Sequence, residues 1–450
     1  MPLSVGASLR QKRGACARRE PYAMSRGHLT PLWRNRDFAL LLGGQVVSTL
    51  GTGVSSIAFP LLVLSLTHSP ARAGIVGFAQ TIPYLVLFLP AGALVDRWAR
   101  KRVMLVADAA RCAAFASIAL ALLAGQVTFA HVVVVALVEG SFFVFFFLSE
   151  SAALPRVVPP EQIPAAIASN QARVQGADLA GQPLGGVLFG LDRALPFVAD
   201  ALSYTLSFVS LLFVRPSFQE QRERPETRLV ADVREGLTWL WRQPLLRAAV
   251  LLIAGSNFAF AGFTLALIVR AKDLGASASL VGAMFAFMGA GAVVGSIVAP
   301  RIQRRVPARV VILGDLWVWA AMMAIAAVPR STVLIGAVAG IAAIGGPIFN
   351  VVFASYRYAL VPDRLLGRVQ SASLVVAWGM TPLGVLAAGF LVQSVGAVAT
   401  LRILGAVSAA LAICGTAIRA VRTAPSIASL GEATGEITSS SEAPRSDARE

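Results

Sequence analysis

The 450-residue sequence predicts an all-α integral membrane protein with twelve transmembrane helices in two pseudo-symmetric six-helix halves. Three observations predict this fold: a very apolar composition, a series of apolar stretches of spanning length, and similar motifs in the two halves. Hydrophobic residues make up 56% of the chain and charged residues 14%, whereas soluble domains carry about 25% charge. A chain this apolar cannot cover a water-exposed surface, so the composition excludes a soluble enzyme.

A helix that crosses a bilayer needs about 20 mainly apolar residues. We identify twelve such stretches, of which the fifth is the least apolar because it carries Arg173, Asp178 and several amide side chains. Short connections on both sides of the fifth stretch support its assignment as a span. The stretches are Phe38–Leu66, Ala73–Val95, Val103–Leu123, Phe129–Phe147, Ile163–Leu191, Ala194–Val214, Ala248–Val269, Leu280–Ala299, Val310–Val328, Val333–Phe353, Val369–Val392 and Ala397–Ile418.

The basic residues predict the orientation of the chain. Cytoplasmic loops of membrane proteins carry an excess of Lys and Arg. Most of the 39 Lys and Arg residues fall in the segments that are cytoplasmic if the N-terminus is inside. The opposite loops hold only Arg72, Arg193, Arg270, Lys272, Arg330 and Arg402. We therefore expect a multi-pass protein of the inner (plasma) membrane with both termini in the cytoplasm. The net charge of +16 then needs no nucleic-acid partner.

These segments divide the chain into five regions. We expect a basic cytoplasmic N-terminus over 1–37, a first six-helix bundle over 38–214, a cytoplasmic linker over 215–247, a second six-helix bundle over 248–420 and a disordered cytoplasmic tail over 421–450. Apolar residues recur at helical spacing in the linker, which predicts an amphipathic helix on the inner membrane surface or, alternatively, a solvated connector. These residues are Val230, Val233, Leu237, Leu240 and Trp241.

The two halves resemble each other. The fifth stretch contains "QPLGGVLFG" from Gln182, and the eleventh contains "TPLGVLAAG" from Thr381. The third and ninth stretches both carry an early aspartate, Asp108 and Asp315. Together these matches indicate a duplicated half, as in transporters that hold substrate between their two halves. Small residues let helices approach and proline bends them, so we expect a packing notch or a hinge at Pro183, Gly186, Pro382 and Gly384.

A charged motif follows the second stretch, in "GALVDRWARKR" from Gly92. It resembles the loop signature of the major facilitator superfamily, Gly-x-Leu-Ala-Asp-Arg-x-Gly-Arg-Lys, with Val95 and Ala99 at the two substituted positions. "LWRNRDFALLLGGQVVSTLG", "FVADALSY", "REGLTWLWRQPLLR" and "LVPDRLLGRVQS" are similar to segments of the bacterial macrolide-efflux and enterobactin-exporter-type branch. The resemblance implies export of an amphiphilic drug, macrolide or siderophore-like compound by proton antiport and alternating access.

Departures from the family pattern keep two alternatives open. Thr52 stands where this branch often has an acid, and the fourth stretch carries Glu139 but no Arg, unlike related drug antiporters. One alternative is a proton-coupled importer of a small metabolite. The other is a transport-inactive membrane scaffold or sensor.

The motif also predicts a gate, formed by Gly92, Asp96, Arg97, Arg100 and Lys101. We expect Asp96 to lie near the N-terminus of the eleventh span, around Gly367–Val369. A carboxylate is stabilised there by roughly 0.3–1 kcal/mol. The contact would join the two halves only while the cytoplasmic side is closed. The alternative is that the basic cluster only anchors the topology.

Acids inside the membrane are costly and are functional candidates by default. Glu139 and Asp178 are therefore the proton-coupling candidates, with a structural acid and an ion pair of Asp178 with Arg173 as the alternatives. Asp108 and Arg111 lie three residues apart and should be neighbours on one helix face. Asp200 is placed near the outer end of its span, where it can be solvated.

Uncharged polar and aromatic side chains on the predicted spans are the substrate-cavity candidates. They favour an amphiphile over a sugar or a phosphate. Scattered cysteines give no metal site, and no nucleotide-binding motif is present, so we expect no metal, no cofactor and no enzyme activity. The expected partners are a small-molecule substrate, protons and the lipid bilayer, with a monomeric chain and no nucleic acid. The cavity candidates are Gln45, Ser48, Thr49, Asn257, Asn350 and Trp378.

Overall fold

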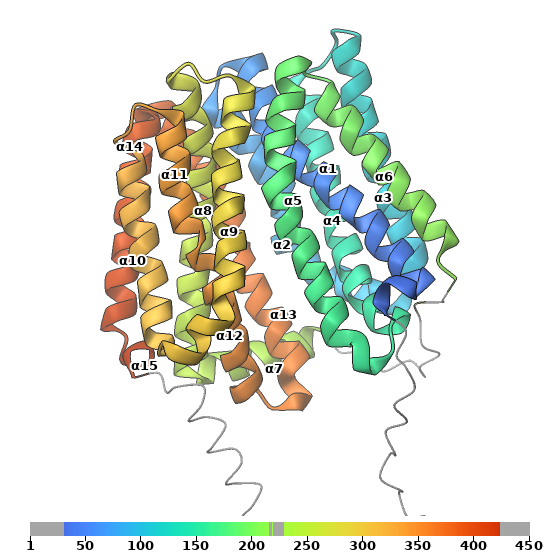
Figure 1. Ribbon diagram of the computed structural model, residues 1–450, viewed down its shortest axis with the longest axis vertical. Coiled ribbons are helices and arrows are strands. Elements are labelled where there is room, and N and C mark those ends of the chain that lie inside the picture. Colours follow the sequence, from blue (N-terminus) through green and yellow to red (C-terminus); the bar gives the residue numbers. More distant parts are fainter. Residues whose placement is uncertain (1–30, 216–217, 219–228, 424–450) are drawn as a thin grey trace, which may run out of the picture.

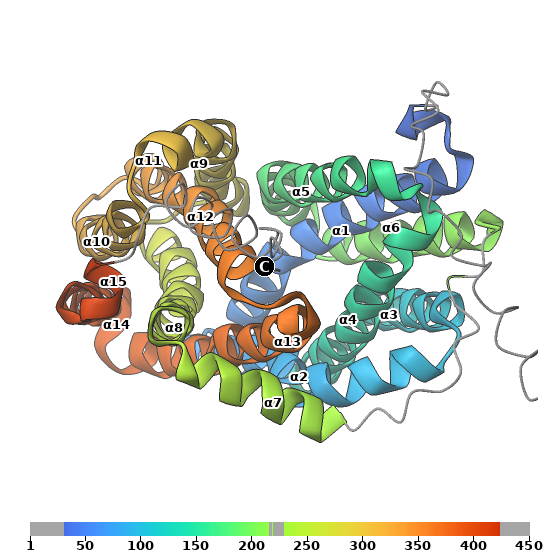
Figure 2. The same ribbon diagram turned by 90° about the horizontal axis from the view of Figure 1, so that it is seen from below.

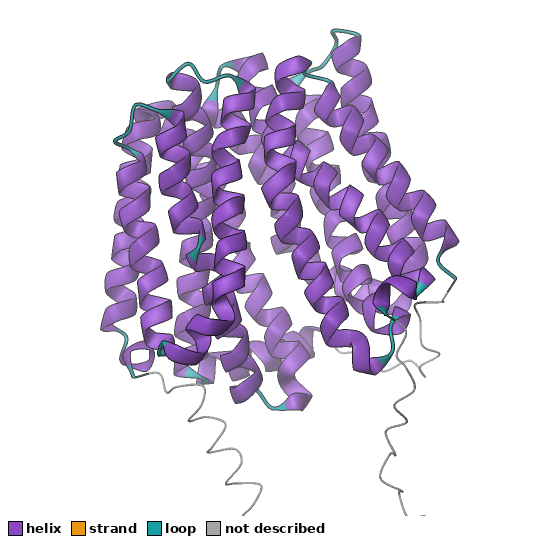
Figure 3. Cartoon of the chain, viewed as in Figure 1, coloured by secondary structure: helices purple, strands orange, loops and turns teal. Residues whose placement is uncertain are grey.

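The computed structural model describes residues 31–215, 218 and 229–423, and this part of the chain is almost entirely helical with no strand (Figure 3). Two short 3₁₀ turns lie at Leu32–Arg34 and Pro160–Gln162. The α-helices are α1 (Arg36–Thr67), α2 (Pro70–Arg97), α3 (Arg100–Leu123), α4 (Phe129–Val157), α5 (Ile163–Leu191), α6 (Leu195–Phe213), α7 (Leu229–Arg242), α8 (Pro244–Asp273), α9 (Ala278–Arg305), α10 (Ala308–Ala326), α11 (Thr332–Ala343), α12 (Gly345–Leu360), α13 (Asp363–Gly379), α14 (Thr381–Ala417) and α15 (Arg419–Arg422).

Ten helical segments of the described residues are long and apolar enough to cross a membrane. The polar α5 is not among them. The last of the ten, Arg368–Ala417, has 50 residues, which as one straight helix would be roughly 75 Å long, more than twice the ~30 Å hydrocarbon thickness. Within it Gly396 has φ 82°, a left-handed conformation that glycine adopts most readily. The chain therefore bends there, while the count of twelve spans stays a prediction.

Polar caps set where several helices begin. Asn35 Oδ1 accepts from the Phe38 backbone N–H at 3.2 Å and so caps α1. Serine or threonine side chains cap α2, α4 and α9 in the same way. Each cap of this kind contributes about 0.5–2 kcal/mol, because it satisfies an N–H that the helix itself cannot pair.

The helices form two groups, α1–α6 and α8–α14, that stand side by side (Figures 1 and 2). In the first group α1 packs on α5 and α6, α2 on α4, and α3 on α4 and α6. The second group repeats this pattern: α8 packs on α14, α9 on α11 and α12, and α10 on α11, α12 and α14. The third helices, α3 and α10, thus occupy corresponding places.

Glycines let the two groups meet at one end of the bundle, the end that holds the α1–α2 connection. A Cβ on Gly186 of α5 would lie 2.5 Å from the Ala278 carbonyl oxygen of α9, and a Cβ on Gly74 of α2 would lie 2.9 Å from Gly389 Cα of α14. At the same end, Ser69 Oγ donates to Gln393 Oε1 at 2.9 Å. Side chains at these glycines would force the helices apart.

The other predicted small-residue positions contact helices in different ways. A Cβ on Gly384 of α14 would lie 2.2 Å from the Phe258 carbonyl oxygen of α8, so this contact is within the second group. Pro183 lies inside α5, and Pro382 lies in the first turn of α14. The close packing fits the expected notch, and the hinge stays a prediction.

The linker contains the expected helix, α7. It crosses the end of the second group and packs on α13 and α8 (Figure 2). A Cβ on Gly236 would lie 2.5 Å from the Arg368 carbonyl oxygen, Glu235 pairs with Arg368, and Leu240 is buried. Leu237 and Trp241 remain exposed. The side chains of Val230 and Val233 lie outside the described residues.

Candidate functional site

A buried ion pair lies inside the first group of helices. Asp108 of α3 accepts from Arg111 Nη2 at 2.6 Å and from Ser207 Oγ of α6 at 2.6 Å. The guanidinium lies between two rings, 4.7 Å from the centroid of Phe146 and 4.3 Å from that of Tyr204. Asp108 is 0% exposed and Arg111 2%. The predicted neighbourhood of Asp108 and Arg111 is confirmed.

Hydrogen bonds extend this pair across the bundle. Gln45 Nε2 of α1 donates to Ser207 Oγ at 3.0 Å, and Gln45 Oε1 accepts from Arg173 Nη1 of α5 at 3.4 Å. Arg173 in turn pairs with Glu150 of α4 at 2.7 Å. The suggested pairing of Arg173 with Asp178 stays a prediction. The Asp178 side chain lies outside the described residues.

The α1 candidates for a substrate cavity are largely engaged by the protein. Gln45 and Ser48 are each 3% exposed, and both ends of the Gln45 amide have partners. Thr49 donates to the Gln45 carbonyl at 2.6 Å. The structure therefore places Gln45 within the polar network of the first group.

Glu139 lies between α4 and α2. Its Oε2 accepts from Gln80 Nε2 at 3.0 Å, and the residue is 2% exposed. A Cβ on the next residue, Gly140, would lie only 1.8 Å from the Gln80 carbonyl oxygen, so the two helices touch backbone to backbone. Within the described residues no salt bridge joins Glu139 to a basic side chain. It is thus a buried acid held by an amide.

Asp200 is also buried, which overturns the expectation that it is solvated. It is 0% exposed and accepts from Ser55 Oγ of α1 at 2.6 Å and from Ser203 Oγ at 3.0 Å. A Cβ on Gly51 would lie 2.3 Å from its Oδ1, so glycine makes room for this carboxylate between α1 and α6. The available sequence signal is the pairing of Gly51 and Ser55 on one helix face.

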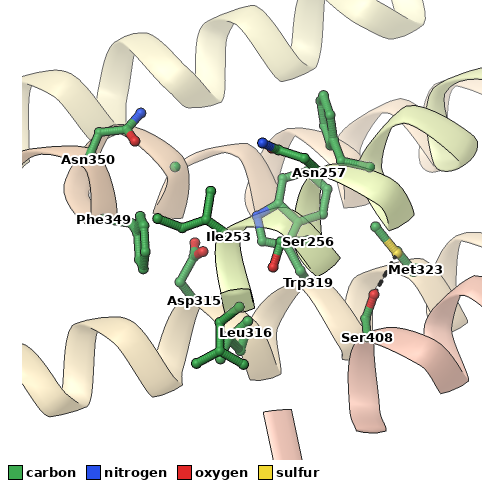
Figure 4. A pocket seen from close by; sticks show the side chains of 13 residues that line it. Ile253, Ser256, Asn257, Asp315, Leu316, Trp319, Met323, Phe349, Asn350 and Ser408 are labelled. Atoms are coloured by element: carbon green, nitrogen blue, oxygen red, sulfur yellow. Dashed lines mark hydrogen bonds between the residues drawn. The ribbon is translucent and has the colours of Figure 1, made fainter. Parts of the chain in front are cut away.

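The second group encloses a cavity of about 290 Å³ between α8, α10, α12 and α14. Asp315 of α10 lines it, and Figure 4 shows its carboxylate pointing toward Ile253 beside the Phe349 ring. Its Oδ1 is buried and has no hydrogen-bond partner among the described residues. A Cβ on Gly345 would lie 2.1 Å from this oxygen, so the glycine leaves space for it.

Two predicted substrate residues line the same cavity, Asn257 of α8 and Asn350 of α12 (Figure 4). Asn257 Nδ2 donates to the Ala377 carbonyl at 2.7 Å, and Asn350 is exposed. The sequence reasoning noted Asp315 only as a repeat match and missed it as a site residue. The available signal is a difference between the repeats: Asp108 is followed three residues later by Arg111, whereas Asp315 is followed at the same spacing by the apolar Val318.

Trp378 of α13 lies elsewhere, in an aromatic cluster that joins the two groups. Its ring centroid is 5.7 Å from Tyr84 and 6.2 Å from Phe88 of α2, and 6.4 Å from Phe147 of α4. Phe143 stacks on Phe147 at 6.0 Å. The cluster gives a broad apolar surface of rings with little hydrogen-bonding capacity.

The charged motif lies at the α2–α3 connection. Arg100 donates to the Ala152 carbonyl at 3.1 Å, and Lys101 donates to the Val214 carbonyl at 2.6 Å. These cations bind carbonyls near the C-terminal ends of α4 and α6, where positive charge is favoured. Glu150 of α4, close to the Ala152 carbonyl along the chain, pairs with Arg173. Arg97 is exposed, and a Cβ on Gly92 would meet no atom within 4 Å.

The predicted contact of Asp96 with the N-terminus of the eleventh span involves a side chain that the structure does not describe. The latch therefore remains a prediction. The described bonds of Arg100 and Lys101 join the motif to carbonyls of α4 and of the segment at the end of α6, including that of Phe218.

Comparison with known proteins gives consistent matches. A family model described as "Transmembrane secretion effector" matches residues 26–435. "Multidrug efflux pump Tap" of Mycobacterium tuberculosis is 27% identical over 396 residues, which cover 85% of this chain and 92% of that protein. "Multidrug efflux pump Tap" of Mycolicibacterium fortuitum is 25% identical over 374 residues, covering 80% and 90%.

Solved structures share the fold at low identity. A bacterial homolog of the human lysosomal transporter Spinster, in an inward-facing and unoccupied conformation, matches with a TM-score of 0.65 at 15% identity, over 88% of this chain and 98% of that one. A POT family transporter in complex with 5-aminolevulinic acid matches with a TM-score of 0.69 at 12% identity, over 84% and 95%. These matches describe the fold alone.

Proposed function

Because the chain belongs to the transmembrane secretion effector family of the major facilitator superfamily, we propose that it exports an amphiphilic small molecule in exchange for protons. As a member of that family it is a multi-pass membrane protein. The export direction is supported by relatives named as multidrug efflux pumps. The observation that carries the proton exchange is Glu139, a buried acid that accepts a hydrogen bond from the Gln80 amide.

Transport in this proposal proceeds by alternating access between two halves, 38–214 and 248–420, joined by the linker 215–247. The repeated packing pattern of the two helix groups supports the division. The excess of Arg and Lys in one set of loops supports cytoplasmic termini in the inner membrane. We propose that a single chain embedded in the bilayer is the transporting unit and that it carries out no catalysis.

The amphiphilic character of the substrate rests on the aromatic cluster around Trp378. Its rings come from α2, α4 and α13, and so from both helix groups. Aromatic walls bind apolar molecules of varied shape and impose few polar requirements. Gln45, Ser48 and Thr49 on α1 would add polar contacts only after rearrangement, because Gln45 and Thr49 are hydrogen-bonded and Ser48 is buried in this conformation.

The direct test is proton release from acid-loaded inverted vesicles on addition of a panel of amphiphilic compounds. We expect release with wild type and its loss in Glu139→Gln or in Asp178→Asn, whichever carries the coupling acid. The matched control is Asp273→Asn, an exposed acid at the end of α8, which should behave as wild type.

Two results would contradict the proposal. Compound-driven release that survives in both variants would remove the coupling role of these acids. Uptake of a compound into whole cells driven by an inward proton gradient, without release in vesicles, would indicate an importer.

A further inference from the structure

The two helix groups hold corresponding acids in different states. Asp108 lies near the start of α3 and Asp315 near the start of α10, the third helices of their groups. The Asp108 carboxylate is fully occupied by Arg111 and Ser207. Asp315 Oδ1, in contrast, is buried without a hydrogen-bond partner among the described residues.

Other parts of the arrangement recur around Asp315. Ser207 of α6 binds Asp108, and Ser408 of α14 lines the same cavity as Asp315, where its hydroxyl donates to Met323 Sδ at 3.2 Å. Phe146 of α4 covers the Arg111 guanidinium, and Phe349 of α12 lines the cavity. The second group therefore keeps an acid, a hydroxyl and an aromatic ring on corresponding helices.

The missing part is the cation. Arg111 follows Asp108 by three residues, and Val318 follows Asp315 by three residues. Val318 is an apolar residue with 39% exposure. Where the first group holds a guanidinium between rings, the second group has a cavity of about 290 Å³ bordered by an acid. None of the described residues that line this cavity is a Lys or an Arg.

We propose that this cavity binds an organic cation, a guanidinium or ammonium group carried by the transported molecule, through Asp315. The inference deepens the proposed function by naming the charge of the substrate, and it rests on that function for the role of the site in transport. Arg111 in the first group shows the mode of binding: one carboxylate to the N–H groups and aromatic rings over the cationic face.

The chemistry of the cavity fits such a group. A carboxylate removed from water is costly unless a cation or donors compensate it. The rings of Phe260 and Trp319, 5.2 Å apart at their centroids, and of Phe349 provide faces that attract a cation. Asn257 and Asn350 offer amide groups for orientation. The volume lies at the lower end of the range of about 300–1,000 Å³ for ligand pockets, which favours a small cationic moiety.

The test uses two probes of the same shape, phenylguanidinium and its neutral analogue phenylurea. Each is titrated into the full chain in lipid nanodiscs, with binding followed by calorimetry. We expect wild type to bind phenylguanidinium at least about tenfold more tightly than phenylurea. Asp315→Asn should reduce the affinity for phenylguanidinium at least about tenfold and leave that for phenylurea unchanged. Asp273→Asn, the exposed-acid control, should match wild type.

A further variant keeps the test decisive if Asp315→Asn does not fold. Ser256→Leu narrows the cavity without changing its charge, and it should weaken phenylguanidinium binding by a similar factor. Equal binding of the two probes by wild type, or undiminished binding of phenylguanidinium by Asp315→Asn, would overturn the inference.

Failure of the inference and failure of the proposed function give different results. Charge-selective binding without any proton release in vesicles would leave the cation site standing and remove the antiport function. Proton release driven by neutral amphiphiles, with no preference for phenylguanidinium in binding, would retain the transporter and remove the cation site.

Discussion

Removing Arg111 should destabilise the protein far more than removing Arg111 and Asp108 together. The carboxylate and the guanidinium are 0% and 2% exposed and 2.6 Å apart. Breaking a buried pair by deleting one partner costs about 3–5 kcal/mol, because a charge remains buried without compensation. Replacing both partners by residues of similar volume is often close to neutral.

The substitutions are Arg111→Met and Asp108→Asn. Methionine keeps the volume and offers its sulfur to Phe146 and Tyr204, a contact worth about 0.3–1.5 kcal/mol that offsets part of the lost ring stacking. Asparagine keeps an acceptor for Ser207. We therefore expect Arg111→Met to lower the free energy of unfolding by about 3–5 kcal/mol, and the double variant to lie within about 1 kcal/mol of wild type.

The assay is a double-mutant cycle on the free energy of unfolding, measured by reversible denaturation in mixed micelles. Asp108→Asn alone leaves the buried guanidinium without its counter-charge and should also cost about 3–5 kcal/mol, so the expected coupling energy is at least about 5 kcal/mol. Arg330→Met, an exposed arginine after α10, is the control and should change stability by less than about 0.5 kcal/mol. A coupling near 0.6 kcal/mol, the average for hydrogen bonds between membrane helices, would refute the view of a desolvated pair.

Three further predictions concern the gate, the contact between the helix groups and the cavity. Asp96→Asn should slow transport markedly at an unchanged protein level in the membrane. Near-normal transport rates of this variant in vesicles would contradict the predicted latch. Gly186→Val should force α5 away from α9, since a Cβ at this position lies 2.5 Å from the Ala278 carbonyl oxygen. Labelling of a cysteine introduced between the helix groups at the α1–α2 end should therefore increase. Unchanged labelling would show that this contact does not close that end of the bundle. Gly345→Ala should displace the Asp315 carboxylate, which lies 2.1 Å from the added atom, and weaken phenylguanidinium binding about tenfold; wild-type affinity would show that the carboxylate can move.

The sequence predicts the helical architecture well because apolar length is a local property. The Ile163–Leu191 span agrees with α5 to the residue, although polar side chains weaken its signal. The fourth span was expected to end at Phe147, whereas α4 continues to Val157. Ser149 and Glu150, which follow the expected end, are 0% and 7% exposed and pack inside the bundle. Local polarity therefore does not distinguish a helix end from a polar interior.

The site was less predictable because its partners lie on different helices. Spacing along one helix identified Asp108 with Arg111, which are three residues apart. The pairing of Arg173 with Glu150 depends on how α5 faces α4, which no sequence pattern specifies. The same holds for Asp200 and for the unpaired Asp315, since their burial follows from glycines on neighbouring helices that leave room for the carboxylates.

The glycine contacts between the helix groups have a mechanical consequence. Gly74, Gly186 and Gly389 bring backbones together whose N–H and C=O groups are already paired within their own helices. Separating such surfaces leaves few polar groups without a hydrogen bond, and lipid or water can cover the separated surfaces at a small cost in free energy. At these glycines the two helix groups are held together by close fit. Such an interface can part and re-form with little free energy to recover, as the proposed alternating access requires.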